Sequence, residues 1–367
     1  MSREHSAEEL LTGISDWVNL ESPTDQPEHV NRLVDHIERE YASFGMETER
    51  IALPGYGDML QTHLGGEGPG VLVICHLDTV WALGTKKLKV EGDIAYGPGI
   101  YDMKAGAFIA FTALRDMVEL NIAPKLPITV LYNSDEEIGS PSSRNYISKL
   151  ANENSYVLVF EPSGPNRAVK TSRSGTARFK IHVSGRASHS GAEHSAGRSA
   201  IVQLAQVILE LEALTDYEEG TTVNVGVIDG GTRANVVPAE ASAYIDIRAT
   251  TSQGMGRVVA ALNGMVPSRD GITIKVEGGV TRDPFERASS EALFLKAKQI
   301  AGAHGVELSG VHSGGGSDGN LTAALGVPTL DGLGALGGGT HADNEHVVIS
   351  ELPARVQLAT WLLSELS

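Results

Sequence analysis

The stretch Val71-Leu72-Val73-Ile74-Cys75-His76-Leu77-Asp78 places five apolar residues directly before a histidine and an aspartate. Short, unbroken apolar runs of this kind are typical of strands that are buried on both faces of a sheet. Similar runs occur at Ile128–Tyr132 and Tyr156–Phe160, and helical sequences lie between them at Lys104–Leu120 and Ser142–Leu150. Alternating strands and helices predict a mostly parallel sheet with helices on both faces. We therefore expect an α/β fold.

The character of the chain changes near residue 175, and the α/β character resumes from about residue 288. The expected elements between these points are a strand at Thr176–Val183, a helix at Ser195–Leu214, strands at Thr222–Ile228 and Ala239–Arg248, a helix at 252–264 and a strand at 271–276. This β-α-β-β-α-β order resembles a ferredoxin-like sandwich. The simplest interpretation is an α/β domain formed by 1–174 and 286–367, with an α+β domain inserted at 175–285. Helical periodicity also marks 7–20, 28–44 and 350–366.

Charge and composition restrict the classes of partner. The chain of 367 residues has 29 basic and 46 acidic residues, a net charge of -17. Nucleic acid is an unsuitable partner because phosphate binding needs a basic surface. No run approaches the ~18–20 apolar residues of a membrane span, and the N-terminus has no apolar signal region. We expect a cytoplasmic protein that binds neither nucleic acid nor membrane. Its one cysteine, Cys75, allows no intramolecular disulfide and no cysteine zinc site.

Acidic and imidazole side chains gather at the ends of the predicted strands or in nearby loops, where open α/β sheets bind ligands. Five of them have metal-binding side chains: His76, Asp102, Glu137, Glu161 and His341. Each alone has an ordinary explanation, such as a solvated strand end or a helix N-cap. Five such groups from five separate segments instead favour a metal site. Zinc accepts imidazole nitrogen and carboxylate oxygen, and this set suffices for two metals if one carboxylate bridges them.

Two further acidic residues add to this site. Residues i and i+2 of an extended chain point the same way, so Asp78 can accept the second ring N–H of His76. Glu136 precedes Glu137 directly, so one of the two can bind metal while the other serves as a base.

The chain as a whole resembles the M20 family of metallopeptidases, and within it the glutamate carboxypeptidase (carboxypeptidase G2-like) branch. The resemblance covers nearly the whole length. It rests on these segments in order: His76-Leu77-Asp78, Asp102-Met103-Lys104, Asp135-Glu136-Glu137-Ile138-Gly139-Ser140, Phe160-Glu161-Pro162, Gly185-Arg186-Ala187-Ser188-His189-Ser190-Gly191, Ala234-Asn235-Val236-Val237-Pro238, Asp246-Ile247-Arg248, Gly314-Gly315-Gly316-Ser317-Asp318 and His341. The chain departs from the family pattern at Cys75 and Ala105, where the family often has glycine. Both side chains are small, so we expect slight repacking and an intact metal site.

The resemblance implies a zinc-peptidase-type α/β catalytic domain with an inserted ferredoxin-like α+β dimerisation (lid) domain. It also implies two Zn²⁺ per chain, which Co²⁺ or Mn²⁺ can replace. Asp102 is then the bridging ligand, His76 and Glu161 complete one zinc site, and Glu137 and His341 complete the other.

Catalytic and substrate contacts also follow from the resemblance. Glu136 corresponds to the general base and Asp78 to the residue that orients His76. His189 corresponds to a residue that reaches a partner subunit's site and stabilises the oxyanion, which predicts a homodimer. Asn235 and Arg248 correspond to contacts with the substrate carboxylate and backbone. Arg282 is a further candidate for a second substrate carboxylate.

The expected function is a di-zinc metallohydrolase that cleaves an amide or peptide bond and releases a C-terminal amino acid, with glutamate favoured. The substrate is then a small peptide or an N-acyl amino acid. The same site also suits an N-acyl-amino-acid deacylase of the acetylornithine deacetylase or aminoacylase type, or a dipeptidase. A non-catalytic binding protein on the same fold is a more distant alternative, which Glu136 argues against.

Two short motifs match other classes of enzyme. Gly315-Gly316-Ser317-Asp318-Gly319 fits the G-x-S-x-G turn of serine hydrolases, but no strong strand precedes it. Gly332-Leu333-Gly334-Ala335-Leu336-Gly337 fits a dinucleotide-binding fingerprint, but more glycines follow it where a helix is needed. Both interpretations are disfavoured against the metal site.

Overall fold

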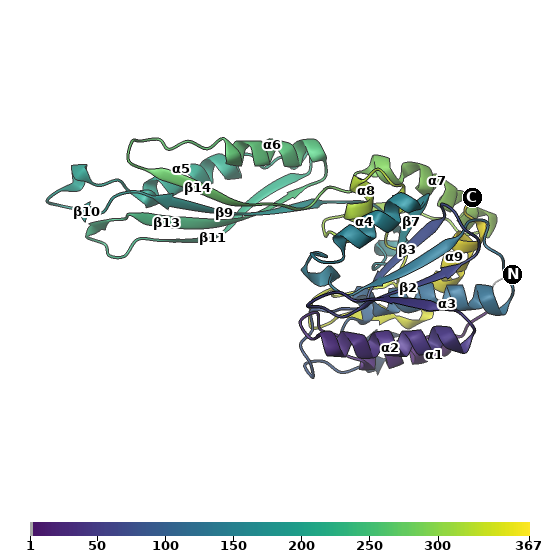
Figure 1. The fold of residues 1–367 in the computed structure, drawn as a ribbon. Coiled ribbons are helices and arrows are strands. Elements are labelled where there is room, and N and C mark those ends of the chain that lie inside the picture. The colour runs from purple at the N-terminus through teal and green to yellow at the C-terminus, as the bar shows by residue number, and fades with distance from the viewer. Residues whose placement is uncertain (1–2) are drawn as a thin grey trace. The chain divides into compact units, whose positions relative to one another are not determined.

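The computed structural model describes residues 3–367, which form two compact units (Figure 1). The first unit contains the chain up to Ser172 together with Arg287–Ser313 and Ser317–Ser367. The second contains Arg173–Glu286 and Gly314–Gly316. The expected α/β fold class, with an α+β segment inserted in the chain, is confirmed.

The first unit is built on a six-stranded sheet of order β1-β2-β6-β3-β7-β16. Its strands are β1 (Thr48–Ile51), β2 (Met59–Leu64), β3 (Val71–His76), β6 (Ile128–Asn133), β7 (Tyr156–Val159) and β16 (Thr329–Leu330). The central strands β6, β3, β7 and β16 run parallel, whereas β1 and β2 pair antiparallel at one edge. The three predicted strands therefore lie side by side, and their carboxyl ends share one edge of the sheet.

The six residues of β3 are all buried because helices cover both faces of the sheet. Val71, Val73 and Cys75 pack into one apolar core, whereas Leu72 and Ile74 pack into the other. The first core includes residues of α1 (Ala7–Asn19), α2 (Pro27–Ser43), α3 (Ala105–Glu119), α7 (Arg287–Ala303) and α9 (Leu352–Glu365). The second includes residues of α4 (Arg144–Glu153) and α8 (Asp318–Ala324). Among the described residues no helix has both the length and the apolar character to cross a membrane.

Smaller strand pairs complete the first unit. A four-stranded sheet has the order β17-β18-β5-β4 and a two-stranded one pairs β15 with β8. Their bounds are β4 (Lys89–Glu91), β5 (Ile94–Tyr96), β8 (Val169–Arg173), β15 (Gly310–Ser313), β17 (Gly337–Gly338) and β18 (His346–Val348). The loop between β17 and β18 contains His341, so the small sheet carries one of the predicted ligands.

The second unit is an antiparallel sheet of order β11-β13-β9-β14 with both of its helices on one face (Figure 1). The elements are β9 (Gly175–Ser184), β10 (Ser188–His189), α5 (Ala200–Glu212), β11 (Thr221–Gly230), β12 (Val236–Val237), β13 (Glu240–Ala249), α6 (Ser252–Asn263) and β14 (Thr273–Arg282). The predicted ferredoxin-like order is present, with β10 and β12 as an additional pair.

Two predicted boundaries in this unit were wrong. Helix α5 begins at Ala200 and not at Ser195, because Ser199 accepts the N–H of Val202 and so caps the helix there. Strand β14 extends to Arg282, beyond the predicted end at 276, because it pairs with β9 along its length through one irregularity after Val280.

Two glycines allow helix α3 to approach the end of β7 closely. A Cβ atom on Gly106 would lie 1.9 Å from the carbonyl oxygen of Phe160, and one on Gly334 would lie 2.2 Å from the same oxygen. The N–H of Gly334 also donates to the carbonyl of Glu161 at 2.9 Å. The backbone that carries Glu161 is therefore packed against residues that have no side chain.

Because of this close approach, we expect one methyl group added at Gly106 to lower the stability of the fold strongly. Gly106→Ala should lower the free energy of unfolding by about 2–3 kcal/mol, because the added atom must displace backbone. Gly302→Ala is the matched control: Gly302 also lies in a helix, α7, and a Cβ there meets nothing within 4 Å. Its substitution should be neutral or stabilise by about 0.5–1 kcal/mol. Urea denaturation measures both, and equal stabilities of the two variants would contradict the packing argument.

Candidate metal centre

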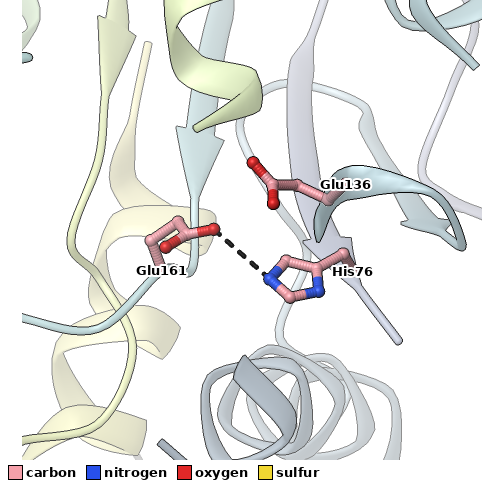
Figure 2. Close-up of side chains that lie close together, drawn as sticks. All are labelled: His76, Glu136 and Glu161. Carbon is pink, nitrogen blue, oxygen red and sulfur yellow. Dashed lines mark ion pairs between the residues drawn. The ribbon is translucent and has the colours of Figure 1, made fainter. Parts of the chain in front are cut away.

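Three of the predicted ligands come from the parallel strands of the first unit. His76 is the last residue of β3, Glu137 lies in a 3₁₀ turn (Glu136–Ile138) shortly after β6, and Glu161 follows β7 by two residues. Because these strands are neighbours, their carboxyl ends bring the three side chains to the same place. Figure 2 shows His76, Glu136 and Glu161 turned toward one another, with Glu161 Oε1 3.5 Å from His76 Nε2.

Asp102 lies between the two histidines. Its Oδ1 is 3.1 Å from His76 Nε2, and its Oδ2 is 3.4 Å from His341 Nε2. His341 Nε2 is also 2.9 Å from Glu137 Oε2. The two oxygens of one carboxylate therefore face two different imidazoles, one accompanied by Glu161 and the other by Glu137. All five predicted ligands are brought together within the first unit.

The donor atoms fit metal ions. The ligand atoms of His76, Asp102 and Glu137 lie within 4.8 Å of one another, as do those of His76, Glu136 and Glu161. Glu136, predicted as the base, is thus also among the groups close enough to contact a metal. Glu137 Oε1 is buried and has no hydrogen-bond partner within residues 3–367. A buried carboxylate oxygen without a partner is costly, so this atom suits a cation that would contact it.

The electrostatics of the cluster show how strongly it favours positive charge. Burial lowers the pKa of His76, but its contacts with Asp102, Asp78 and Glu161 raise it well above its usual value. Hydrogen bonds with Asp102 and Glu137 raise the pKa of His341 to about 10. The surrounding carboxylates therefore favour the protonated form of both imidazoles. Metal ions require neutral imidazole, so their binding would release these protons.

The pKa of Glu137 is shifted in the opposite direction to that of Asp102. Burial raises the pKa of Glu137 to about 7, and the hydrogen bond with His341 only partly offsets it. Burial acts in the same direction on Asp102, but hydrogen bonds from His341 and His76 hold its pKa below the usual value. The neighbouring imidazoles therefore favour the ionised form of Asp102.

Asp78 joins β3 to the turn with the two glutamates. Its carboxylate accepts the N–H of Glu136 and of Glu137, each at 3.2 Å, and the hydroxyl of Thr24 at 2.8 Å. Toward His76 the shorter contact is from Nδ1 to the backbone oxygen of Asp78, at 3.0 Å, while the carboxylate lies at 3.5 Å. Asp78 thus lies beside His76, as the sequence predicts, and it also holds the backbone of the glutamate turn.

The 3₁₀ turn that carries Glu136 and Glu137, called the glutamate turn below, is also held by contacts on its other side. Asp135 accepts the N–H of Ser142 at 2.8 Å and that of Ser143 at 3.2 Å, so its carboxylate faces helix α4 and not the metal ligands. Gly139 ends the turn at φ 94°, a left-handed conformation that side chains rarely adopt. Glu136 and Glu137 are left as the two carboxylates of this segment that face the cluster.

Glu345 is a site residue that the sequence interpretation missed. Its Oε1 accepts the N–H of Tyr101 at 2.9 Å and that of Asp102 at 3.1 Å, and its Oε2 accepts the N–H of Gly99 at 3.1 Å. The indole N–H of Trp81 donates to the same carboxylate. A buried glutamate thus fixes the backbone that carries Asp102. The only signal in the sequence is an acidic residue four positions after His341, which does not distinguish it from a solvated charge.

His189 and Asn235 lie close together in the second unit. His189 pairs with Val236 between β10 and β12, and the N–H of Ser190 donates to the carbonyl of Asn235 at 3.1 Å. The backbone N–H groups of Gly191 and Ala192 both donate to His189 Nδ1, each at 3.1 Å. Because Nδ1 accepts, the proton of the neutral ring is on Nε2 of this exposed side chain.

Arg248 and Arg282 flank the same residue of β9. Thr176 is the partner of Arg248 in β13 and of Arg282 in β14. Directly opposed residues of antiparallel strands point to the same face, so the two arginines lie on one face of the sheet. Arg248 is paired with Asp246, with Nε 2.7 Å from Oδ1, whereas Arg282 is largely buried. Each unit holds its own part of the predicted site.

The two competing motifs have structural roles. Ser317 is buried, its hydroxyl donates to Asp331 at 2.5 Å, and it caps helix α8. The nucleophile of a serine hydrolase must be accessible to substrate at a surface turn. Ser317 is buried and its hydroxyl is bonded to a carboxylate, so it does not fit that role. The glycine-rich segment 332–337 leads into β17, and no helix follows it directly as the dinucleotide fingerprint would require.

Comparison with known proteins agrees with this geometry. The model of the peptidase family M20/M25/M40 matches residues 72–365. The chain belongs to this family. Carboxypeptidase G2 from Pseudomonas sp. (strain RS-16) is 31% identical to this M20-family chain, over 97% of the chain and 89% of that protein. The expected resemblance is therefore confirmed, and the protein is an enzyme of the metallopeptidase class.

Two further relatives extend the comparison. Succinyl-diaminopimelate desuccinylase from Thioalkalivibrio sulfidiphilus (strain HL-EbGR7) is 25% identical over 90% of the chain and 92% of that protein. The crystal structure of a tripeptidase from Staphylococcus aureus matches with a TM-score of 0.85 and 21% identity, and the match covers 99% of each chain. The second similarity shows that the whole chain shares the fold of that peptidase.

The missed residue Glu345 generates a prediction. Glu345→Gln keeps the size but puts an NH₂ group and no charge against three backbone N–H donors. We expect zinc affinity to fall about 10- to 100-fold, as is typical when a residue that orients a ligand is changed. Competition with a chromogenic chelator measures this. Glu351→Gln is the control, because Glu351 pairs with Arg167 at the surface. Unchanged affinity in Glu345→Gln would show that Glu345 does not position Asp102.

Proposed function

We propose that this M20-family enzyme is a two-metal amidohydrolase that releases a C-terminal amino acid, with glutamate as the favoured product. The observation that carries the proposal is the position of Asp102, whose two oxygens face two different imidazoles. One carboxylate shared by two ligand sets is the arrangement that a two-metal site needs. His76 and Glu161 would complete one site, and His341 and Glu137 would complete the other.

Zinc is the metal that the donors favour. The five ligands offer imidazole nitrogen and carboxylate oxygen with no thiolate, which suits Zn²⁺ in catalytic sites and also Co²⁺ or Mn²⁺. Glu137 Oε1, which has no hydrogen-bond partner among residues 3–367, supports occupation by a cation. The carboxylates that raise the pKa values of the two histidines would attract a metal ion in the same way. When bound, such ions supply Lewis acidity at the scissile carbonyl and make a water molecule more acidic.

Glu136 has the role of proton carrier in this proposal. Its backbone N–H is held by Asp78, and its side chain faces His76 and Glu161 (Figure 2). A carboxylate at this position can take the proton of the attacking water and then deliver it to the leaving amine. The carboxylate of the neighbouring Glu137 contacts His341, so Glu137 belongs to the proposed ligand set. The adjacent glutamates thus have different partners.

The preference for glutamate rests on the pair of arginines in the second unit. Because Arg248 and Arg282 flank Thr176 on one sheet face, they offer two guanidinium groups to a product with two carboxylates. Arginine binds carboxylates through charge-assisted hydrogen bonds. Asp246 now holds Arg248, so a substrate carboxylate would share or replace this contact. The relative named carboxypeptidase G2 supports release of a C-terminal residue.

A second candidate is an N-acyl-amino-acid deacylase, which the relatives named succinyl-diaminopimelate desuccinylase favour. The bond cleaved and the roles of the catalytic residues are the same. Only the recognition of the two halves of the substrate differs.

The proposal predicts a dependence on the substrate's free carboxylate. Zinc-loaded enzyme should hydrolyse an N-acyl-L-glutamate, and amidation of the α-carboxylate should lower kcat/KM by about 10²-fold or more, because Arg248 would lose its charge-assisted hydrogen bonds with the substrate. Arg248→Ala should lose activity on the acid and lose little further on the amide. Equal cleavage of acid and amide by the wild type would contradict carboxypeptidase-type recognition.

Glu136→Gln and Glu137→Gln are the matched pair for the chemical step. Glu136→Gln should retain two metals per chain by elemental analysis and lose about 10²- to 10⁴-fold in kcat, as loss of general-base catalysis implies. Glu137→Gln should lose metal as well. Full turnover in Glu136→Gln would overturn the assigned roles.

The proposal includes a homodimer formed through the second unit. The edge strand β11 exposes Val227 and Ile228, and helix α5, which packs beside it, exposes Val202 and Leu209. An exposed apolar strand edge invites pairing with another chain. His189 would then serve the site of the neighbouring subunit, where its Nε2–H can donate to the developing oxyanion.

Subunit mixing tests this arrangement. His189→Ala and Glu136→Gln chains should each be nearly inactive, and an equimolar mixture should recover about one quarter of wild-type activity after complete exchange, because half of the dimers then contain one intact site. Replacing the second chain by one that carries both substitutions is the control and should give no recovery. Absence of recovery after exchange has been demonstrated by mass spectrometry would assign His189 to its own chain.

A further inference from the structure

A cavity of about 440 Å³ in the second unit has a positively charged wall. It lies where the first turn of α5 meets the segments around β10 and β12 and the loop that follows α6. Among the described residues, Arg198 and Arg269 line it, and no aspartate or glutamate does. In a chain with a net charge of -17, such a wall is a local reversal of charge. We call this cavity the arginine pocket.

Arg198 is fixed at the wall without losing its charge. Its Nε donates to the backbone carbonyl of Asp270 at 2.9 Å. Its Nη1 donates to the carbonyls of Ser195 and Gly197, at 3.2 and 2.8 Å. All three acceptors are neutral backbone oxygens, so they orient the guanidinium group but leave its positive charge uncompensated.

Arg269 adds a second positive charge. Within residues 3–367 its side chain has no hydrogen bond and no ion pair. The adjacent Asp270 borders a neighbouring cavity of about 760 Å³, which both arginines also line. Asp270 is the one carboxylate that the described residues contribute to either wall. The two guanidinium groups therefore outnumber the acidic groups at this site.

Gln203 turns hydrogen-bond donors toward the same cavity. Its side chain is in the wall although the residue is only 3% exposed. Its Oε1 accepts the backbone N–H of Ser268 at 2.7 Å and the hydroxyl of Ser268 at 2.8 Å. A backbone N–H can only donate, so the amide oxygen must face Ser268 and the NH₂ group must face away from it. That NH₂ group has no hydrogen-bond partner in the described part of the chain.

A buried donor without a partner is costly, so the NH₂ group of Gln203 indicates an acceptor that a ligand would supply. The rest of the wall is largely apolar and includes Val202, Val237, Pro238 and Ile272. Val202 is 53% exposed, although it is apolar. The volume is in the range of small-molecule sites. The cavity thus combines donors and positive charge with a surface that suits hydrocarbon.

We propose that the arginine pocket binds a small organic carboxylate with a short hydrocarbon body. The carboxylate would accept charge-assisted hydrogen bonds from Arg198 and Arg269 and a further one from the NH₂ group of Gln203. The hydrocarbon would lie against the apolar wall. The pocket is lined by none of the predicted metal ligands and by none of the residues assigned above to catalysis or to substrate. It is therefore an additional site, and its existence does not depend on the proposed hydrolysis.

The position of the pocket gives its occupant an effect on the second unit. Ser190, in the wall, follows His189 directly, and the wall residues Ala234 and Val236 flank Asn235. A ligand that contacts these segments would restrain the two loops that carry His189 and Asn235. Local opening of these loops, and with it the exchange of their amide hydrogens, should then become slower.

Amide hydrogen exchange followed by mass spectrometry tests the proposal on the full zinc-loaded chain. Hexanoate is compared with hexanamide, which has the same length without the charge, and with acetate, which lacks the hydrocarbon. Hexanoate should slow exchange in 190–203 and 264–272, and hexanamide should not. Acetate should bind about tenfold more weakly than hexanoate, because it buries fewer methylene groups. Because the readout is local to these segments, a carboxylate bound at the metal ligands is not counted.

Two variants examine the residues of the pocket. Arg269→Gln removes one charge from a side chain that holds no other group, and it should weaken hexanoate about three- to tenfold. Gln203→Glu keeps an oxygen for Ser268 but puts a carboxylate oxygen where the NH₂ group was, so it should weaken hexanoate more than about tenfold. Because Arg269 is exposed and has no partner within residues 3–367, Arg269→Gln decides the outcome even if Gln203→Glu fails to fold.

Arg257→Gln is the matched control. Arg257 lies on α6 of the same unit, pairs with Glu219 and does not line the pocket. Its substitution changes the net charge equally and should leave the affinity for hexanoate unchanged. Equal protection by hexanoate and hexanamide, or equal affinity of the wild type and Arg269→Gln for hexanoate, would overturn the proposal. Equal affinity for acetate and hexanoate would overturn the assignment of the apolar wall.

Discussion

The concentration of buried carboxylates around two imidazoles is the constraint on which the first unit depends. Asp78, Asp102, Glu137 and Glu161 are all nearly inaccessible to solvent. Burying one unpaired carboxylate costs several kcal/mol, so four in one place require compensating positive charge and hydrogen bonds. The carboxylates raise the pKa values of His76 and His341, so the imidazoles can supply part of this positive charge. Divalent cations satisfy it more fully, which is why the same geometry is suited to metal catalysis.

The surrounding structure holds these charges in place with backbone contacts. Asp78 binds the N–H groups of the glutamate turn, and Glu345 binds the N–H groups around Asp102. Gly106 and Gly334 let the backbone of Glu161 lie against α3. Backbone contacts of this kind hold the ligand side chains in position before a metal binds. Binding then costs less conformational entropy. These residues therefore act on the candidate site through the backbone that they hold.

The central strands and the predicted metal ligands could be identified from the sequence. The strands β3, β6 and β7 are unbroken apolar runs, and a run of that length between helical segments has few alternatives. The predicted metal ligands follow such strands or lie in nearby loops, and their residue types have specific chemistry. Glu345 could not be predicted, because its role depends on three N–H groups more than 240 positions away in the chain. The start of α5 was misplaced because the apolar pattern does not show which serine caps the helix.

The sequence by itself determined the class of fold, the family and the set of candidate metal ligands, because these depend on local pattern and on residue type. Only the tertiary structure decided how those side chains are paired. Asp102 faces both histidines because two loops from distant parts of the chain meet there. Arg248 and Arg282 flank Thr176 because of strand register, and a shift of one residue would turn either side chain to the other face. Lys86 likewise pairs with Asp343 because the loop after β3 meets the loop of His341, a contact between segments about 250 residues apart that no local pattern encodes.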